Sequence, residues 1–164
     1  RWRGVPFYLR SGKRLAHRFT EIAVQYRRVP TSIFRPLLNE HLAPNVLRFR
    51  IQPNEGIAIT FESKHPGPKL CLSTVTMDFG YQGTFGAAPP EAYQRLILDA
   101  LLGDPTLFAR EDGVEECWRI LAPFLDAAEE AEGLHGYPAG SRGPKAAAEL
   151  LSADGRKWYE EEAA

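Results

Sequence analysis

Four segments between residues 20 and 79 alternate apolar with polar side chains, and this alternation constrains the fold more than any other feature. A two-residue period predicts strands of a sheet that has one apolar, buried face and one polar face. The turn sequence PNEG at residues 53–56 joins the second segment to the third and predicts an antiparallel hairpin. The apolar members of the four segments are Ile22, Val24 and Tyr26; Leu47, Phe49 and Ile51; Ile57 and Ile59 with Phe61; and Val75, Met77 and Phe79.

After residue 80 the apolar residues recur at helical spacing, which predicts amphipathic helices. The first helix is expected from Pro90 to Gly103, and a third from Pro144 to a stop near Gly155. The second is expected to begin near Asp112 with a capping box and to be kinked or stopped by Pro123. The chain of 164 residues is therefore expected to form one α+β domain, a large and mostly antiparallel sheet with helices packed on one face.

The charge is divided unevenly along the chain. Residues 1–50 hold 11 basic and 2 acidic side chains, whereas the remaining residues hold 9 basic and 19 acidic ones. Such a basic segment suits an anionic partner, either nucleic acid or a small phosphorylated compound, and it is equally typical of a solvated surface.

Several functional classes find no support in the sequence. No apolar run approaches the ~18 residues of a membrane helix, and residues 1–30 resemble no signal peptide, so we expect a cytoplasmic protein without a membrane partner. Cys71 and Cys117 have no metal-binding spacing and are expected to be reduced. The four histidines form no metal or triad pattern, and no dinucleotide fingerprint is present, so we expect no metal. Because the first residue is Arg1 and the single methionine is Met77, we expect the chain to be a piece of a longer protein.

The stretch that most suggests binding chemistry is residues 1–18, RWRGVPFYLRSGKRLAHR. A short strand expected over Val5–Leu9 leads to Arg10, and Ser11-Gly12 then breaks the strand. Lys13, Arg14 and Arg18 follow within one loop, where side-chain cations and backbone N–H groups could converge on a phosphate. An array of this kind is also common on a positive surface without a ligand.

Six blocks of the sequence, in this order and spacing, resemble the C-terminal part of glucose-6-phosphate dehydrogenase. They are GVPFYLRSGKRLAHRFTEI, RIQPNEGI, the pair Met77-Asp78, PEAYQRLILDALLGD, TLFAR and GSRGP, and the resemblance runs from Arg1 to about Trp158. It implies an NADP-linked or NAD-linked oxidation of glucose 6-phosphate to 6-phosphogluconolactone, the entry to the pentose phosphate pathway.

The resemblance also implies which parts of the enzyme are absent here. The family has an N-terminal dinucleotide-binding domain and a larger α+β domain, and residues 1–164 resemble the latter part of the second, which binds substrate and mediates oligomerisation. The coenzyme fingerprint and the histidine that serves as general base belong to segments without a match in this chain. We therefore expect no catalytic residue in residues 1–164, no activity of the chain alone, and a coenzyme bound mainly by the other domain.

Three substrate contacts can be assigned by resemblance. The lysine of the RSGK block, which binds the sugar phosphate in the family, is Lys13, and the basic residue five positions later is Arg18. The glutamine of the RIQPNEG block is Gln52, which alternation places on the polar face of its strand beside Arg50. Gln52 could also be an ordinary solvent-facing residue of the strand.

Some family members hold a second, structural NADP in this domain. Residues that resemble its site are Arg10, Arg50, Asp78, Arg142 and Trp158, but three expected cations are replaced by Phe19, Ala23 and Thr60. A hydrogen bond to a charged group contributes about 1.5–3 kcal/mol, so the loss of three cations weakens a pyrophosphate site severely. We expect no tightly held structural NADP and assign no cofactor-binding residue.

The expected partners are glucose 6-phosphate and further copies of the chain, in a homodimer or homotetramer assembled through the sheet. A non-catalytic relative that keeps this domain as a binding or scaffold module is the alternative. A nucleic-acid partner is not expected, because no zinc, RRM or helix-turn-helix signature accompanies the basic segment.

Overall fold

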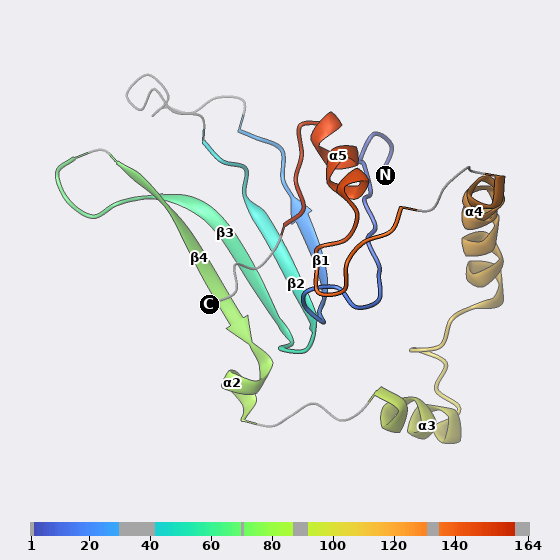
Figure 1. Ribbon diagram of the computed structural model, residues 1–164. Helices are drawn as coiled ribbons and strands as arrows, with labels where there is room; N and C mark the ends of the chain where they lie inside the picture. Colours follow the sequence, from blue (N-terminus) through green and yellow to red (C-terminus); the bar gives the residue numbers. More distant parts are fainter. Residues whose placement is uncertain (1, 30–41, 70, 87–91, 131–134, 160–164) are drawn as a thin grey trace. The chain divides into compact units, whose positions relative to one another are not determined.

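A computed structural model describes residues 2–29, 42–69, 71–86, 92–130 and 135–159, and Figure 1 traces the chain. These residues form two compact units. One contains Arg1–Ala88 together with Pro138–Ala164, and the other contains Pro89–Tyr137. Each unit is described by itself.

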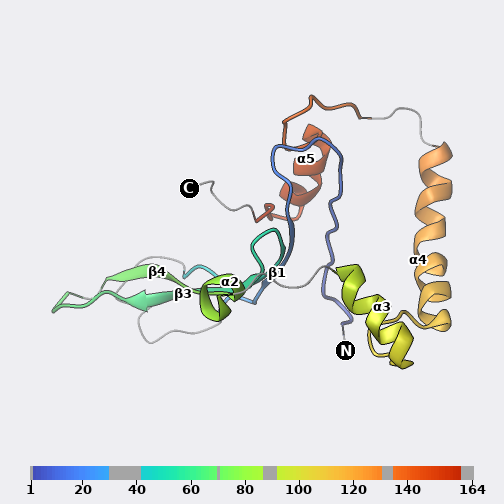
Figure 2. The same ribbon diagram turned by 90° about the horizontal axis from the view of Figure 1, so that it is seen from below.

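The first unit is built on a four-stranded antiparallel sheet. Its strands are β1 (Thr20–Gln25), β2 (Val46–Gln52), β3 (Gly56–Lys64) and β4 (Leu72–Gly80), and they lie side by side in chain order. β2 and β3 form the hairpin expected around residues 53–56. The two longest strands, β3 and β4, extend beyond β1 and β2 in both views (Figures 1 and 2). The expected α+β class and the antiparallel sheet are confirmed.

The strand pairing places the apolar side chains of all four strands on one face. Ile22 lies opposite Phe49, which lies opposite Ile57, and Phe79 completes this row on β4. The sequence predicts that the apolar face of the sheet is the buried one, and the structure differs from this expectation. Ile22 is 55% exposed, whereas the buried apolar residues of the sheet, Val46 and Ala58, alternate with the apolar row and so lie on the opposite face. Polarity assigns side chains to faces, but burial depends on what else packs against each face.

A single arginine connects β2 to β4 across β3. Arg50 Nη2 donates to Asp78 Oδ1 at 2.8 Å and to the Phe79 carbonyl at 3.4 Å. Gly56 of β3 stands in register between Arg50 and Gly80, so the arginine side chain crosses β3 at a residue without a side chain. A Cβ atom at Gly56 would overlap the Phe79 carbonyl oxygen and would lie 2.5 Å from Arg50 Nη2.

Among the residues that the structure describes, two helices belong to this unit. The short helix α2 (Tyr81–Phe85) follows β4 directly and was not expected from the sequence. Helix α5 (Lys145–Ala153) begins after Pro144 and is followed by Gly155 at a positive φ of 66°, close to the expected bounds. Leu151 of α5 is buried, and both views show α5 beside the segment that precedes β1 (Figures 1 and 2).

The second unit contains helices α3 (Ala92–Leu102) and α4 (Glu111–Glu130). The expected start of α3 at Pro90 lies outside the described residues, and its end at Gly103, with a φ of 69°, agrees with the sequence. Asp99 of α3 is 1% exposed and pairs with Arg95 one turn earlier at 2.8 Å. In the described part of the chain, no helix combines the length and the apolar character that crossing a membrane requires.

Three expectations are corrected. Val5–Leu9 is not a strand, because no backbone partner pairs with it among the described residues and Pro6 lacks an N–H group. Pro123 does not stop its helix, since α4 continues to Glu130, and the alternative of a kink at Pro123 stays a prediction. Asp112 is not a helix cap, because α4 begins one residue earlier and the Asp112 carboxylate instead accepts from Arg110 at 2.7 Å.

Replacement of Gly56 by alanine tests the crossing of Arg50 over β3. We expect Gly56→Ala to lower the free energy of unfolding by about 1–3 kcal/mol or more, because the added Cβ meets backbone that cannot move aside. The matched control is Gly80→Ala at the register partner, where φ is −115° and nothing lies within 4 Å of the new Cβ. Urea unfolding followed by circular dichroism measures both variants, and equal unfolding free energies would contradict this packing.

Candidate functional site

The loop that precedes β1 carries the expected phosphate-binding cations. Lys13 and Arg14 occupy a bend in which Arg14 has a φ of 56°, a left-handed conformation that is uncommon for a residue with a side chain. Two backbone hydrogen bonds join the bend to residues 140 and 141. Gly140 N donates to Arg14 O at 2.8 Å, and Ala16 N donates to Ser141 O at 2.9 Å. A segment more than 120 residues later in the chain therefore sets the position of the Lys13 loop.

The residues before this bend are attached to the C-terminal part of the unit. The Tyr8 hydroxyl donates to the Asp154 carboxylate and accepts from Arg156 Nη1 at 3.0 Å. Further along, the Arg10 guanidinium lies 4.6 Å from the ring centroid of Trp158. Arg10 is thereby directed to Trp158, so it does not form one uniform array with Lys13, Arg14 and Arg18.

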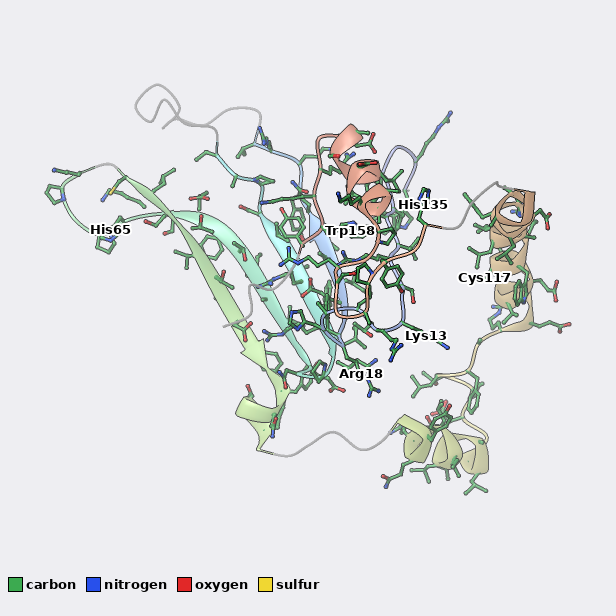
Figure 3. All side chains as sticks on the ribbon, in the orientation of Figure 1. Lys13, Arg18, His65, Cys117, His135 and Trp158 are labelled. Atoms are coloured by element: carbon green, nitrogen blue, oxygen red, sulfur yellow. The ribbon has the colours of Figure 1, made fainter. Side chains whose placement is uncertain are left out.

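The third expected substrate contact, Gln52, lies at the end of the sheet where β1 begins. It is the register partner of Thr20, and Gln52 Nε2 donates to Thr20 Oγ1 at 3.1 Å. Arg18 precedes Thr20 by two residues, and Figure 3 shows Arg18 and Lys13 toward this same end of the sheet. Gln52 is thus joined to the strand that Arg18 precedes, and Lys13 lies toward the same end of the sheet in the view of Figure 3.

This region combines two kinds of recognition chemistry. A lysine ammonium and an arginine guanidinium are donors that make strong, charge-assisted hydrogen bonds to phosphate oxygens. A glutamine amide offers both a donor and an acceptor, which suits a hydroxyl group. The three side chains therefore suit an anionic, hydroxyl-rich ligand.

One histidine, His17, lies in the same loop as Lys13 and directly precedes Arg18. His17, His65 and His135 are exposed, and His41 lies outside the described residues. In the ranges described, no group of three or more His, Cys, Asp or Glu side chains could hold a metal ion. The three expected substrate contacts can bind and orient a ligand, and the expectation that no catalytic residue lies in this chain stays a prediction.

The residues that resemble a structural NADP site are partly engaged with one another. Arg50 pairs with Asp78, and Arg10 covers the face of Trp158. Thr60, which replaces an expected lysine, exchanges a hydroxyl hydrogen bond with Thr76 at 3.1 Å. The residues present fit a tightly bound dinucleotide poorly, and the absence of a structural NADP stays a prediction.

Sequence reasoning missed the residues that hold the site together. Thr20 was not assigned a role, and alternation could not have found it: a regular pairing of β1 with β2 would place Thr20 opposite Ile51, and an irregularity in the register between Thr20 and Glu21 places it opposite Gln52 instead. Gly140 and Ser141 belong to the GSRGP block, but no periodicity or spacing in the sequence indicates that their backbone bonds to residues 14 and 16.

Together these features define an α+β domain built on an antiparallel sheet, with a cationic loop and an amide at one end of that sheet. The family model described as "Glucose-6-phosphate dehydrogenase, C-terminal domain" matches residues 1–159, and the chain belongs to this family.

Curated relatives and solved structures agree with the family. A glucose-6-phosphate 1-dehydrogenase 2 of Mycobacterium bovis is 46% identical over 162 residues, which cover 96% of this chain and 31% of the relative. A glucose-6-phosphate 1-dehydrogenase of Aggregatibacter actinomycetemcomitans is 44% identical, again over 96% of this chain and 31% of the relative. A solved glucose-6-phosphate dehydrogenase in complex with its substrate glucose-6-phosphate superposes with a TM-score of 0.77 at 34% identity, covering 91% of this chain and 30% of that one. The chain thus spans about a third of the length of these relatives.

The hydrogen bonds of the Tyr8 hydroxyl predict that the stability of the folded chain depends on pH. The hydrogen bond to Asp154, assisted by desolvation, raises the pKa of Tyr8 above its ordinary value, and it does so against the opposing effect of Arg156. A raised folded-state pKa means that this contribution to stability is complete below the unfolded-state pKa of about 10 and is lost as the pH rises through the folded-state pKa.

Tyrosinate absorbance measures this shift. The difference between the pH titrations of the unmodified chain and of Tyr8→Phe isolates Tyr8, and we expect its midpoint above the ordinary tyrosine pKa of about 10. Asp154→Asn should lower the midpoint, because it removes the carboxylate that favours the neutral phenol and leaves Arg156 in place. A midpoint at or below 10 in the unmodified chain would contradict the assigned contact.

Proposed function

We propose that the chain is part of the substrate-binding domain of a cytoplasmic glucose-6-phosphate dehydrogenase. The intact enzyme oxidises glucose 6-phosphate to 6-phosphogluconolactone, with NADP or NAD, as a step of the pentose phosphate pathway. Family membership and a related structure that contains glucose-6-phosphate support this proposal. The observation that carries it is the position of Lys13, Arg18 and Gln52 toward one end of the sheet.

The three side chains bind and orient the sugar phosphate. Lys13 and Arg18 neutralise the phosphate through charge-assisted hydrogen bonds, and Gln52 exchanges a hydrogen bond with a sugar hydroxyl. NADP or NAD, bound mainly by the other domain, supplies the hydride acceptor. Holding the sugar in one orientation converts its encounter with the coenzyme into an effectively unimolecular step.

We further propose that the intact protein is a homodimer or homotetramer assembled through the sheet. The apolar face of the sheet supports this, because it presents in-register apolar rows whose outer members Ile22 and Met77 are 55% and 63% exposed. Contiguous apolar surface of this kind marks an interaction site more often than a solvated face.

A comparison of Lys13 with its neighbour Arg14 tests the substrate assignment. In the intact enzyme, we expect Lys13→Ala to reduce kcat/KM for glucose 6-phosphate by about 10- to 150-fold, the equivalent of about 1.5–3 kcal/mol for a hydrogen bond to a charged group. Arg14→Ala retains the backbone carbonyl that accepts from Gly140 and should change kcat/KM by less than about threefold. Equal losses in the two variants would show that bulk charge, and not a specific contact, attracts the substrate.

The 164-residue chain by itself should lack dehydrogenase activity. Hydride transfer needs a held coenzyme and a base for the hydroxyl proton, and we expect both outside this chain. Glucose 6-phosphate should perturb the NMR signals of Lys13, Arg18 and Gln52 only at about millimolar concentrations, since the remaining phosphate contacts are also expected elsewhere. Reduced coenzyme formed by chain that has been freed of intact enzyme would contradict the proposed division of roles. A lack of activity in the intact protein would instead favour the non-catalytic module.

A further inference from the structure

The side-chain amide of Gln52 is attached to Thr20, the first residue of the neighbouring strand. Gln52 ends β2 and Thr20 begins β1, and the two are register partners. Their hydrogen bond, from Gln52 Nε2 to Thr20 Oγ1, is 3.1 Å long. Since Thr20 follows Arg18 by two residues, this bond joins the amide to the strand that continues from the cationic loop.

In this arrangement the amide nitrogen of Gln52 faces Thr20, and the hydrogen bond restrains the terminal torsion of the side chain. The terminal torsion of glutamine is broad and roughly two-fold, so without a partner the amide nitrogen and the carbonyl oxygen exchange places readily. The side chain of Thr20 is β-branched and restricted at χ1, which makes its hydroxyl a stiff acceptor. With the nitrogen held by Thr20, the carbonyl oxygen is directed away from it.

The carbonyl oxygen of Gln52 remains available to a ligand. Among the residues that the structure describes, Thr20 is the hydrogen-bond partner of the Gln52 side chain, and it occupies one of the two amide protons. A carbonyl oxygen accepts hydrogen bonds and a phosphate oxygen donates none, so this atom recognises a hydroxyl group and not the phosphate.

We propose that Thr20 is a positioning residue for the sugar, which it serves by holding Gln52 with its carbonyl oxygen presented to a sugar hydroxyl. This inference rests on the proposed function, in which Lys13 and Arg18 hold the phosphate of the same ligand. Thr20 itself need not touch the substrate. Its effect is to remove the cost of ordering the Gln52 side chain when the sugar binds.

Kinetics of the intact enzyme test the proposal with two ligands. The KM for glucose 6-phosphate depends on both the phosphate and the hydroxyl contacts, whereas competitive inhibition by inorganic phosphate depends on the cations alone. We expect Thr20→Val to raise the KM about two- to tenfold, which corresponds to the ordering of one flexible side chain. The inhibition constant of phosphate, kcat and the KM for the coenzyme should change by less than twofold, and Thr20→Ser, which keeps the hydroxyl, should restore the KM.

A matched control and a double variant complete the test. Thr76→Val also removes a hydroxyl hydrogen bond from this sheet, the one to Thr60, and it should leave the KM for glucose 6-phosphate unchanged. In the presence of Gln52→Ala, the change Thr20→Val should have no further effect, because the two residues act through one contact. Thr20→Ala adds no volume and replaces Thr20→Val in every comparison if the valine variant does not fold.

The outcomes separate this inference from the proposed function. If Gln52→Ala raises the KM and both Thr20→Val and Thr20→Ala leave it unchanged, Thr20 is not a positioning residue and the substrate assignment stands. If the Thr20 variants weaken phosphate inhibition as much as they raise the KM, Thr20 supports the loop and not the amide, which also overturns the inference. If Gln52→Ala itself leaves the KM unchanged, the assignment of Gln52 fails and the role of Thr20 fails with it.

Discussion

The passage of Arg50 over Gly56 is the interaction on which the rest of the sheet depends. It joins β2 to β4 through the Asp78 carboxylate, and it requires that a residue without a side chain stand between them in β3. This requirement resists any slip of the strands, because a one-residue change of register moves every side chain of a strand to the other face. Gln52 lies two residues beyond Arg50 on the same strand, and an irregularity in the register between Thr20 and Glu21 makes Gln52 the partner of Thr20.

The proposed substrate site depends on three segments that are distant in the sequence. The cationic loop supplies Lys13 and Arg18, the end of β2 supplies Gln52, and the backbone of Gly140 and Ser141 holds the bend of the loop. The bend therefore depends on residues that never need to touch a ligand. A change at position 140 or 141 would be expected to alter substrate binding by moving the loop, without removing any of its charge.

The sequence allowed much of this fold to be predicted, for reasons that particular elements make clear. Alternation identified all four strands, and the PNEG turn identified the β2–β3 hairpin, because both signals are local. Alternation did not predict which face of the sheet is buried. Ile22 is exposed and Ala58 is buried because burial depends on what packs against each face. Pro123 shows another limit of local signals, since α4 continues through it to Glu130. Resemblance suggested Lys13, Arg18 and Gln52 as substrate contacts, but the partner of Gln52 became apparent only from the observed register.

The most direct test of the central claim is a crystal structure of the intact protein with bound glucose 6-phosphate. The account predicts that the phosphate oxygens lie within roughly 3 Å of Lys13 Nζ and of the Arg18 guanidinium, and that a sugar hydroxyl lies at a similar distance from the Gln52 carbonyl oxygen. A sugar phosphate bound elsewhere, with none of these three side chains in contact with it, would contradict the account.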